Sequence, residues 1–224
     1  MSPMASAMLS LLCVLSALTA SGHALSCKVC MASFSTWCDG ASVVCPAGQV
    51  CVSAYTLTTV DGSKVSEEFS RACGPTSQCN TPGSVAIPRG KIKRNTSCCF
   101  TENCFPPTPS LPEDNSELNG VTCSTCISPD SDWCHTEETM RCTGNENMCV
   151  LESSHQYEPL EQLTAIRGCA TQSICDIGTQ EVAYGFLNMT MKIKCSSASS
   201  PLYSPLLPSF TLTVASILAV LSLW

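Results

Sequence analysis

The stretch CKVCMASFSTWC, residues 27–38, decides the fold of this chain, because it places a Cys-x-x-Cys pair before a third cysteine. This spacing occurs in zinc sites, in redox-active pairs and in disulfide frameworks. The choice among them depends on the compartment in which the chain folds, since the compartment sets the redox state of its thiols.

Residues 1–24 have the outline of a secretory signal peptide. They contain no charged side chain, and an almost continuous apolar run over residues 8–20 ends in Ser21-Gly22-His23-Ala24. Small residues one and three positions before a cut after Ala24 favour cleavage there, although the usual basic residue at the start is missing. The alternative, a retained membrane-spanning helix, needs about 20 apolar residues, and this run is shorter. We therefore expect residues 1–24 to be removed.

Removal of Cys13 with the signal peptide leaves 18 of the 19 cysteines, an even number, in an oxidising compartment. Thiols there normally form disulfides. A zinc site at the Cys-x-x-Cys pair would usually need histidine ligands, but only His135 and His155 remain, and neither lies near a spare cysteine pair. A redox catalyst usually has one isolated Cys-x-x-Cys pair. The stretch therefore indicates a disulfide framework, and no metal or other cofactor is expected.

The cysteines occur in two copies along the chain. Each cysteine of the second copy lies 96 to 98 residues after its counterpart, by subtraction, and Trp37-Cys38 recurs as Trp133-Cys134. The matched sets are Cys27, Cys30, Cys38, Cys45, Cys51, Cys73, Cys79 and Cys98, against Cys123, Cys126, Cys134, Cys142, Cys149, Cys169, Cys175 and Cys195. A repeat at one offset indicates a duplicated domain. We predict a first domain over residues 25–105 and a second over residues 122–195.

Residues 106–121 form the linker between the predicted domains. Their prolines favour an extended, semi-rigid spacer, and their acidic and polar side chains favour contact with solvent. Residues 25–105 contain 7 Lys or Arg and 5 Asp or Glu, the linker contains 0 and 3, and residues 122–195 contain 4 and 10. The resulting charges of +2, −3 and −6 sum to the net charge of −7. A net-acidic exported chain is not expected to bind nucleic acid.

Between the cysteines, each domain has strand and hairpin patterns. The clearest runs from Ala54 to Phe69, with β-branched and aromatic residues on both sides of Asp61-Gly62, a pair that accepts positive φ. The mature domains show no long period of about 3.6 residues. Domains of this size bury little core and commonly rely on disulfides, each stabilising by about 2–4 kcal/mol. The predicted fold class is all-β and disulfide-rich.

This pattern resembles the lymphocyte-antigen-6/urokinase-receptor (LU) family of three-finger domains. The resemblance is carried by LSCKVC at the mature start, by the ten-cysteine order of the first copy and by CCFTENC at residues 98–104. It covers essentially all of residues 25–195 and implies two tandem three-finger (LU) domains. Within the family, CTGNENMCV (residues 142–150) and IRGCATQSIC (residues 166–175) look like the two-domain phospholipase A2 inhibitors of the gamma type.

The disulfide pairing is implied by the resemblance, because sequence alone does not determine connectivity. One constraint is independent: a bond between the neighbours Cys98 and Cys99 would be strained, so they should face different partners. Carried over by position, the family implies the pairs Cys27–Cys51, Cys30–Cys38, Cys45–Cys73, Cys79–Cys98, Cys99–Cys104, Cys123–Cys149, Cys126–Cys134, Cys142–Cys169 and Cys175–Cys195. The chain departs from the family twice, since Ser196-Ser197 follows Cys195 without a last small loop, and Phe105 stands where asparagine is usual.

Residues 196–224 have the outline of a glycosylphosphatidylinositol (GPI) attachment signal. No charged residue follows Lys194, and small residues at 196–200 lead through a short spacer to an apolar tail over residues 206–224. A spanning helix usually has basic residues after it, whereas here the tail ends the chain and contains Pro208. We expect a GPI anchor attached at one of residues 196–199, with Ser197 preferred because Ala198 and Ser199 follow it; a spanning helix and a secreted product are the alternatives.

Two sequons, Asn95-Thr96-Ser97 and Asn188-Met189-Thr190, predict N-glycosylation. The alternative for Asn95 is that the nearby residues Cys98 and Cys99 leave too little room for a glycan.

The chain has no GxSxG elbow, HExxH helix or P-loop, and His135 is a lone histidine in a disulfide-rich domain. We expect no catalytic residue, and hence no enzyme.

A basic cluster, Arg89 to Arg94, lies in what the family would call the third finger. It is either a solvated strand of alternating charge or a docking patch for an acidic partner or lipid headgroups. With the central hairpin, it gives the candidate partner-binding residues Tyr55, Asp61, Gly62, Arg89, Lys91, Lys93 and Arg94.

Two functions fit this organisation. Hairpins on a cross-linked base suit protein recognition, so the first is a non-catalytic binding module for an extracellular or cell-surface protein, with the central hairpins (residues 55–69 and 152–166) as recognition surfaces. The second, implied by the resemblance, is inhibition of secreted phospholipase A2. The expected anchor favours the first, since gamma-type inhibitors are typically soluble. We expect a protein anchored at the cell surface, which shedding or secretion could also release.

Overall fold

The computed structural model describes residues 24–158, 160–184 and 187–197. The first domain contains the strands β1 (Ser26–Ser33), β2 (Ala41–Val44), β3 (Gln49–Val60), β4 (Ser63–Pro75), β5 (Gly83–Ile87) and β6 (Gly90–Cys99), with the short 3-10 helix η1 (Thr76–Gln78). The second contains β7 (Leu118–Ser124), β8 (Cys126–Ser128), β9 (Thr139–Thr143), β10 (Met148–Glu158), β11 (Gln162–Ala170), the one-turn helix α2 (Gln172–Cys175), β12 (Thr179–Tyr184) and β13 (Leu187–Ser197). The predicted all-β fold class is therefore confirmed.

Three antiparallel hairpins, β1–β2, β3–β4 and β5–β6, make up the first domain, and β6 also pairs with β3. The central hairpin turns at Asp61 and Gly62, whose φ angles are 49° and 76°. Positive φ at both turn residues matches the twist of the flanking strands, and Asp-Gly accepts it at low cost. The hairpin predicted over residues 54–69 is confirmed.

The second domain repeats the central and third fingers as β10–β11 and β12–β13. Its first part differs, because β7 and β9 form a separate two-stranded sheet and β8 pairs with β11. β7 begins at Leu118, before Thr122, where the second domain was expected to start. Two tandem three-finger domains nevertheless describe the chain.

Nine disulfides cross-link the two domains internally. Five lie in the first domain and four in the second: Cys27–Cys51, Cys30–Cys38, Cys45–Cys73, Cys79–Cys98, Cys99–Cys104, Cys123–Cys149, Cys126–Cys134, Cys142–Cys169 and Cys175–Cys195. These are the pairs that the family resemblance implies. Cysteine sulfurs accordingly dominate the buried clusters inside each domain.

The two domains share one sheet, in the order β12-β13-β10-β11-β5-β6-β3-β4-β1-β2. The junction is β5 of the first domain against β11 of the second, where Ala170 pairs with Val85. Thr171 extends it: its N–H donates to the carbonyl oxygen of Ser84 (3.0 Å), and the N–H of Ser84 donates to its hydroxyl (3.1 Å).

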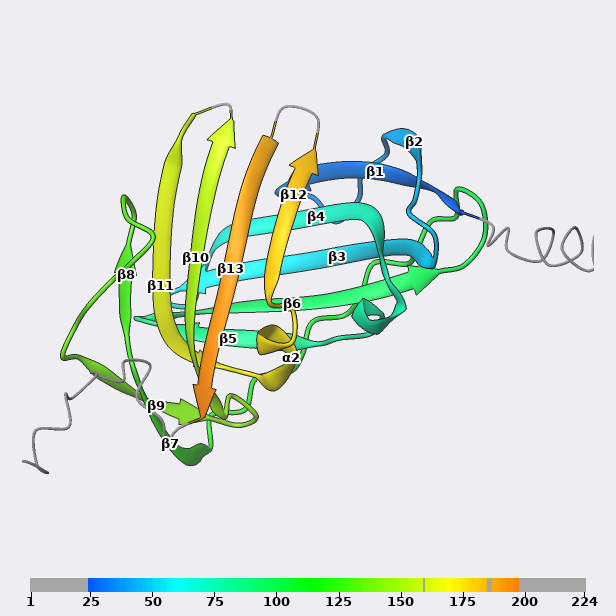
Figure 1. Ribbon diagram of the computed structural model, residues 1–224. Helices are drawn as coiled ribbons and strands as arrows, with labels where there is room; N and C mark the ends of the chain where they lie inside the picture. Colours follow the sequence, from blue (N-terminus) through cyan, green and yellow to red (C-terminus); the bar gives the residue numbers. More distant parts are fainter. Residues whose placement is uncertain (1–23, 159, 185–186, 198–224) are drawn as a thin grey trace, which may run out of the picture.

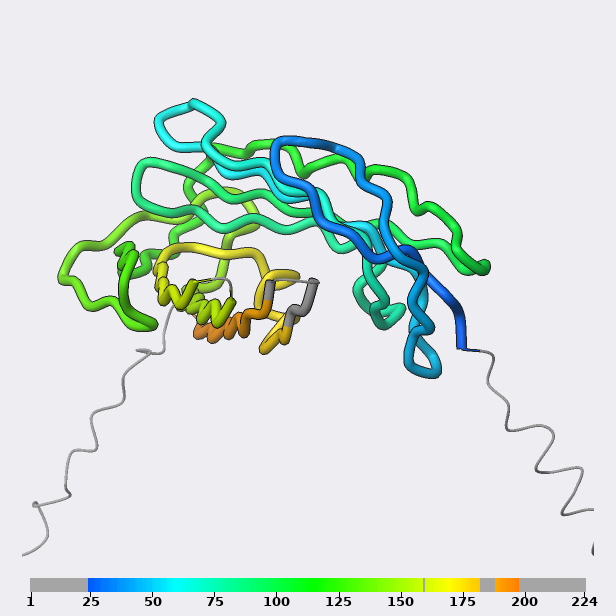
Figure 2. The backbone as a smooth tube through the Cα atoms, turned by 90° about the horizontal axis from the view of Figure 1, so that it is seen from above, coloured from blue at the N-terminus to red at the C-terminus, as the bar shows by residue number. Residues whose placement is uncertain are grey.

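This shared sheet folds back on itself. The strands of the second domain cross in front of those of the first (Figure 1), and from above the first domain arches over β10–β13 (Figure 2). β12, at one edge of the sheet, consequently comes close to β1 near the other edge. The main apolar cluster lies between the layers and draws on both domains: Val85, Ile87, Val150, Ala170, Ile174 and Ile193. Small domains thus gain a core by packing against each other.

The linker lies along the outer face of the first domain. The carbonyl oxygen of Pro107 accepts hydrogen bonds from the hydroxyls of Ser53 and Ser97. Farther on, Asp114 pairs with Lys93 at 2.6 Å. Asp114 remains largely exposed, but the segment as a whole is held to the strands rather than standing free in solvent.

Candidate functional site

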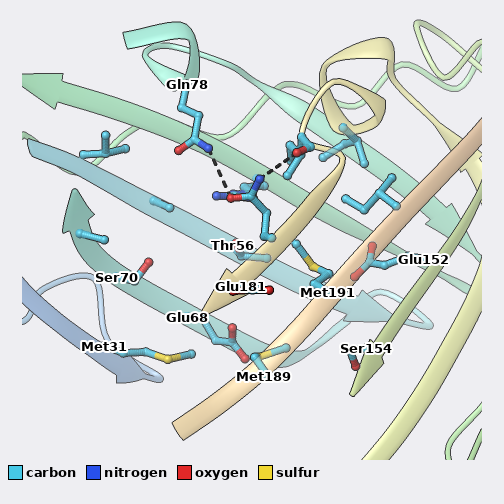
Figure 3. Close-up of a pocket in the computed structure, with 18 of the residues that line it drawn as sticks. Met31, Thr56, Glu68, Ser70, Gln78, Glu152, Ser154, Glu181, Met189 and Met191 are labelled. Carbon is cyan, nitrogen blue, oxygen red and sulfur yellow. Dashed lines mark hydrogen bonds between the residues drawn. The ribbon is translucent and has the colours of Figure 1, made fainter. Parts of the chain in front are cut away.

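A cavity of about 840 Å³ lies between the two layers of the folded sheet. Side chains alternate along a strand, so one face of each strand supplies its wall. From the first domain come residues such as Met31, Thr56 and Glu68, and from the second Glu152 and Met191, all pointing into the same space (Figure 3). The volume lies in the range of ligand-binding pockets, about 300–1,000 Å³. Neither domain forms this cavity alone.

The wall is mainly apolar with a few charged groups. Glu68 and Glu152 contribute carboxylates from the two layers, and Arg94 is the one basic residue among the described residues that line it. Gln78 in η1 donates a hydrogen bond from its Nε2 to Oε1 of Gln180 on β12 (3.5 Å), which links the two layers. An apolar concave surface with a few convergent polar groups is the usual form of a binding site.

Glu152 is the most unusual of these groups. Burial in the cavity raises the pKa of its carboxyl above its usual value, and Arg94 on the facing strand β6 opposes that shift. Burial is the larger of the two effects, because a carboxylate that leaves water loses much of its hydration. Glu68 adds negative charge to the same cavity.

Glu152→Gln is expected to stabilise the protein near neutral pH and to change nothing at low pH. The folded-state pKa lies above the unfolded one, so the folded protein holds a proton that the unfolded chain releases. The free energy of unfolding therefore falls as the pH rises from the unfolded pKa towards the folded pKa, and glutamine removes this loss. Melting temperatures between about pH 3 and pH 8 test it, with the exposed Glu161→Gln as control. A difference that does not vary with pH would contradict the assignment.

The central hairpin turns its candidate Tyr55 away from the cavity. On the outer face, the Tyr55 hydroxyl donates to Oε1 of Glu67 (2.7 Å), and Lys64 lies 2.5 Å from Oε2. Burial, with the Glu67 hydrogen bond and charge, raises the pKa of Tyr55 to about 12. The hydrogen bonds from Lys64 and then Tyr55 lower the pKa of Glu67. Tyr55 is thus engaged within its own hairpin.

The predicted basic cluster is divided between two faces. Arg89 pairs with Asp61 across the finger tips at 2.5 Å. Lys91 and Lys93 point to the outer face, where both pair with Asp114 of the linker. Arg94 lines the cavity on the other face. The alternating charge of this strand therefore finds its acidic partners largely within the chain.

Both domains carry a tryptophan over a buried arginine. The guanidinium carbon of Arg71 lies 5.3 Å from the ring centre of Trp37, and that of Arg167 lies 4.4 Å from Trp133. Burial lowers the pKa of both arginines. No sequence motif singled out these arginines, although they recur at the same offset of 96 residues, by subtraction, as Trp37 and Trp133.

The structure describes three of the predicted modification sites, Asn95, Asn188 and Ser197. The side-chain nitrogen of Asn95 donates to the carbonyl oxygen of Ser110 (2.6 Å), and that of Asn188 donates to Glu158 (2.8 Å). Ser197 is exposed at the end of β13. The predicted signal peptide, apart from Ala24, and the apolar tail lie outside the described residues. No helix within the described ranges is long and apolar enough to cross a membrane.

Groups of cysteine sulfurs lie close together, but they belong to disulfides. The three sets are Cys27, Cys45 and Cys73; Cys51, Cys99 and Cys104; and Cys123, Cys142 and Cys169. Metal ligation needs thiolates, which disulfide sulfurs do not provide. These sets therefore cross-link the base of each domain.

The chain matches the u-PAR/Ly-6 domain family twice, over residues 23–107 and 119–201. It is 25% identical over 189 residues to the phospholipase A2 inhibitor NAI of Notechis ater, which covers 83% of this chain and 94% of that protein. It is 32% identical over 126 residues to the urokinase plasminogen activator surface receptor of Aotus trivirgatus, covering 55% of this chain and 36% of the receptor. The crystal structure of mouse TEX101 matches with a TM-score of 0.37 and 16% identity over 77% of this chain and 99% of that one. With two matched domains that span most of its length, the chain belongs to the u-PAR/Ly-6 family.

Proposed function

We propose that this protein is a non-catalytic, extracellular binding module that takes a segment of a partner protein into the cavity between its two domains. The observation that carries the proposal is the cavity itself, an apolar surface with convergent polar groups that only the paired domains create. The family match supports an extracellular binding role. Rigid cross-linked strands also hold such a surface in shape before the partner arrives, which lowers the entropic cost of binding.

Filling the cavity is expected to abolish partner binding. Met191 and Lys192 are neighbours on β13, but Met191 lines the cavity and Lys192 lies on the opposite face of the strand. Met191→Trp should therefore lose at least about tenfold in affinity, or about 1.4 kcal/mol, whereas Lys192→Trp should bind normally. Cross-linking on living cells, followed by mass spectrometry of captured extracellular proteins, compares the two. Identical captured proteins for both variants would contradict the cavity as the binding site.

A second candidate function is inhibition of a secreted phospholipase A2. It is favoured by the similarity to phospholipase A2 inhibitors, which include a gamma-type inhibitor chain of Laticauda semifasciata, 27% identical over 179 residues. The purified, glycosylated protein should then inhibit hydrolysis by at least one member of a panel of secreted phospholipases A2. Inhibition that is saturable and lost in Met191→Trp would join the two candidates in one site. An inactive but folded protein would exclude this function for the panel.

We further propose the remaining architecture as the sequence predicts it. Residues 25–105 and 122–195 are the domains, residues 1–24 a cleaved signal peptide, and Asn95 and Asn188 glycosylation sites. Residues 196–224 are a GPI signal with attachment at Ser197, so the protein is tethered to the plasma membrane. The small residues around Ser197 and the terminal apolar tail support this anchor.

Phosphatidylinositol-specific phospholipase C is expected to release the protein from expressing cells. The enzyme cleaves the lipid anchor and leaves a spanning helix untouched, so most of the surface signal should move to the medium. A known GPI-anchored protein serves as the positive control. If it is shed while this protein stays on the cells, the anchor is a spanning segment; if the protein is found in the medium before treatment, it is secreted.

A further inference from the structure

The cavity has a closed side and an exposed side. The sheet folds at the β5–β11 junction, and there Ile92, Ile177 and Met191 line the cavity and also pack against the apolar core. On the opposite side, β1 and β2 form a rim, where Met31 is 37% and Val44 69% exposed. Three strand spacings separate β1 from β6, or about 14 Å. A linear ligand can therefore enter at the rim and extend towards the core.

The strands that form the walls offer hydrogen bonds to a ligand only through their side chains. β3 and β6 in one layer, and β10 and β13 in the other, each pair with a neighbouring strand on both sides. Their backbone N–H and C=O groups are therefore used within the sheet. A peptide backbone on the closed side would leave most of its own amides unpaired, which is costly, whereas an alkyl chain has no such groups. A partner protein reaches the closed side only with its side chains.

The charged groups of the cavity leave an apolar strip beside them. Thr56 on β3 pairs with Glu68 on β4 and with Arg94 on β6, so these residues form one row across the first layer. Arg94 already interacts with Glu152 of the facing layer. The neighbouring wall residues towards the base of the fingers are small or apolar: Val52, Ala54 and Ala72.

Methionines from both layers face this strip. Met31 on one layer, and Met189 and Met191 on the other, point into the same space (Figure 3). Methionine is unbranched and polarisable, so it adapts its shape to a flexible apolar ligand. Contact with such side chains removes apolar ligand surface from water without requiring a hydrogen bond.

We propose that the cavity binds a single unbranched alkyl chain of a lipid, which enters past Met31 and Val44 and extends towards Ile177 and Met191. Its polar head stays in water at the rim. This inference goes beyond the proposed partner binding, and a bound alkyl chain would compete with a partner segment for the same cavity. A free fatty acid and a single-chain phospholipid share this chemistry.

Methyl signals of methionine give a direct readout of cavity occupancy. The purified protein, carrying 13C-methyl methionine, would be titrated with octanoate, decanoate and dodecanoate below their micelle-forming concentrations. The signals of Met31, Met189 and Met191 should shift, but not that of Met140, which packs in a separate cluster. Affinity should rise about fourfold for each added methylene, since each one is buried.

Decylphosphocholine and dodecylphosphocholine distinguish the two lipid sources, because they carry the same alkyl chains on a different head. Affinities at equal chain length should differ by less than about tenfold, since a head that remains hydrated contributes little. A larger difference would overturn the placement of the head in water and would identify the source that binds more tightly.

Variants then assign the binding to the cavity. Met191→Trp and Ala54→Leu fill it from opposite layers, and each should weaken dodecanoate at least about tenfold, whereas Lys192→Trp should bind it normally. Melting temperatures show that the variants fold. Affinity that does not depend on chain length, shifts confined to other methionines, or no shift at the highest soluble concentration would overturn the proposal. The titration contains no partner protein, so its failure leaves the result of cross-linking on cells unchanged.

Discussion

Gly168→Val is expected to separate the two domains. Gly168 lies where β11 meets β5, and a Cβ atom added there would stand 1.9 Å from the carbonyl oxygen of Ala86. That oxygen belongs to the backbone and cannot rotate away, so the strand pairing itself must yield. The expected loss in the free energy of unfolding is about 3 kcal/mol, the upper end for overpacking.

The loss of pairing would also open the cavity, because its two walls would no longer be held together. Small-angle scattering should therefore show a larger radius of gyration for Gly168→Val than for the unchanged protein. Gly48→Ala is the control: Gly48 has a φ of 82° and no atom near its missing Cβ, so it loses stability without losing compactness. A compact Gly168→Val protein with an intact cavity would refute this account of the junction.

Glu146→Ala is expected to cost about 3 kcal/mol through a buried ion pair that ties the domains together. Glu146, in the second domain, is 2% exposed, and its Oε1 lies 2.9 Å from Nζ of Lys91 in the first domain. The same oxygen accepts a hydrogen bond from the hydroxyl of Ser84 at 2.7 Å. Removing the carboxylate leaves a poorly hydrated ammonium, with Asp114 at 3.8 Å as its remaining partner.

Denaturant titration at neutral pH measures this cost. Glu161→Ala provides the comparison, because Glu161 also pairs with one residue, His155, but its side chain is 74% exposed. Exposed pairs contribute only about 0–1 kcal/mol. A cycle with Lys91→Met should give a coupling of about 2 kcal/mol with Glu146→Ala. If the Glu146 and Glu161 variants prove equally stable, the buried pair does not hold the domains together.

The two stretches that look like gamma-type inhibitors contain both of these residues. Glu146 lies in CTGNENMCV and Gly168 in IRGCATQSIC. The two stretches look typical of gamma-type inhibitors, but the cysteine spacing does not indicate which residues Glu146 and Gly168 contact. Each acts on a residue more than 50 positions earlier, Lys91 or Ala86, and such contacts depend on how the domains dock.

The candidate site was only partly predictable for a related reason. Strand alternation in β6 separates Lys91 and Lys93 from Arg94, and this alternation was visible in the sequence. The sequence did not indicate which face of β6 the linker would cover and which face would line a cavity, because both faces carry similar side chains. No sequence motif marked Met189 or Met191 as site residues.

The sequence by itself determined the all-β fold, the duplication and the central hairpin. These features follow from cysteine spacing, from alternation along strands and from turn residues such as Asp61-Gly62, all of which act over short separations or within one domain. The tertiary structure alone decided that β5 pairs with β11, that an apolar core forms between the domains and that a cavity remains there. The strand pairing, the shared core and the cavity depend on the complementary shape of two surfaces, which no local pattern encodes.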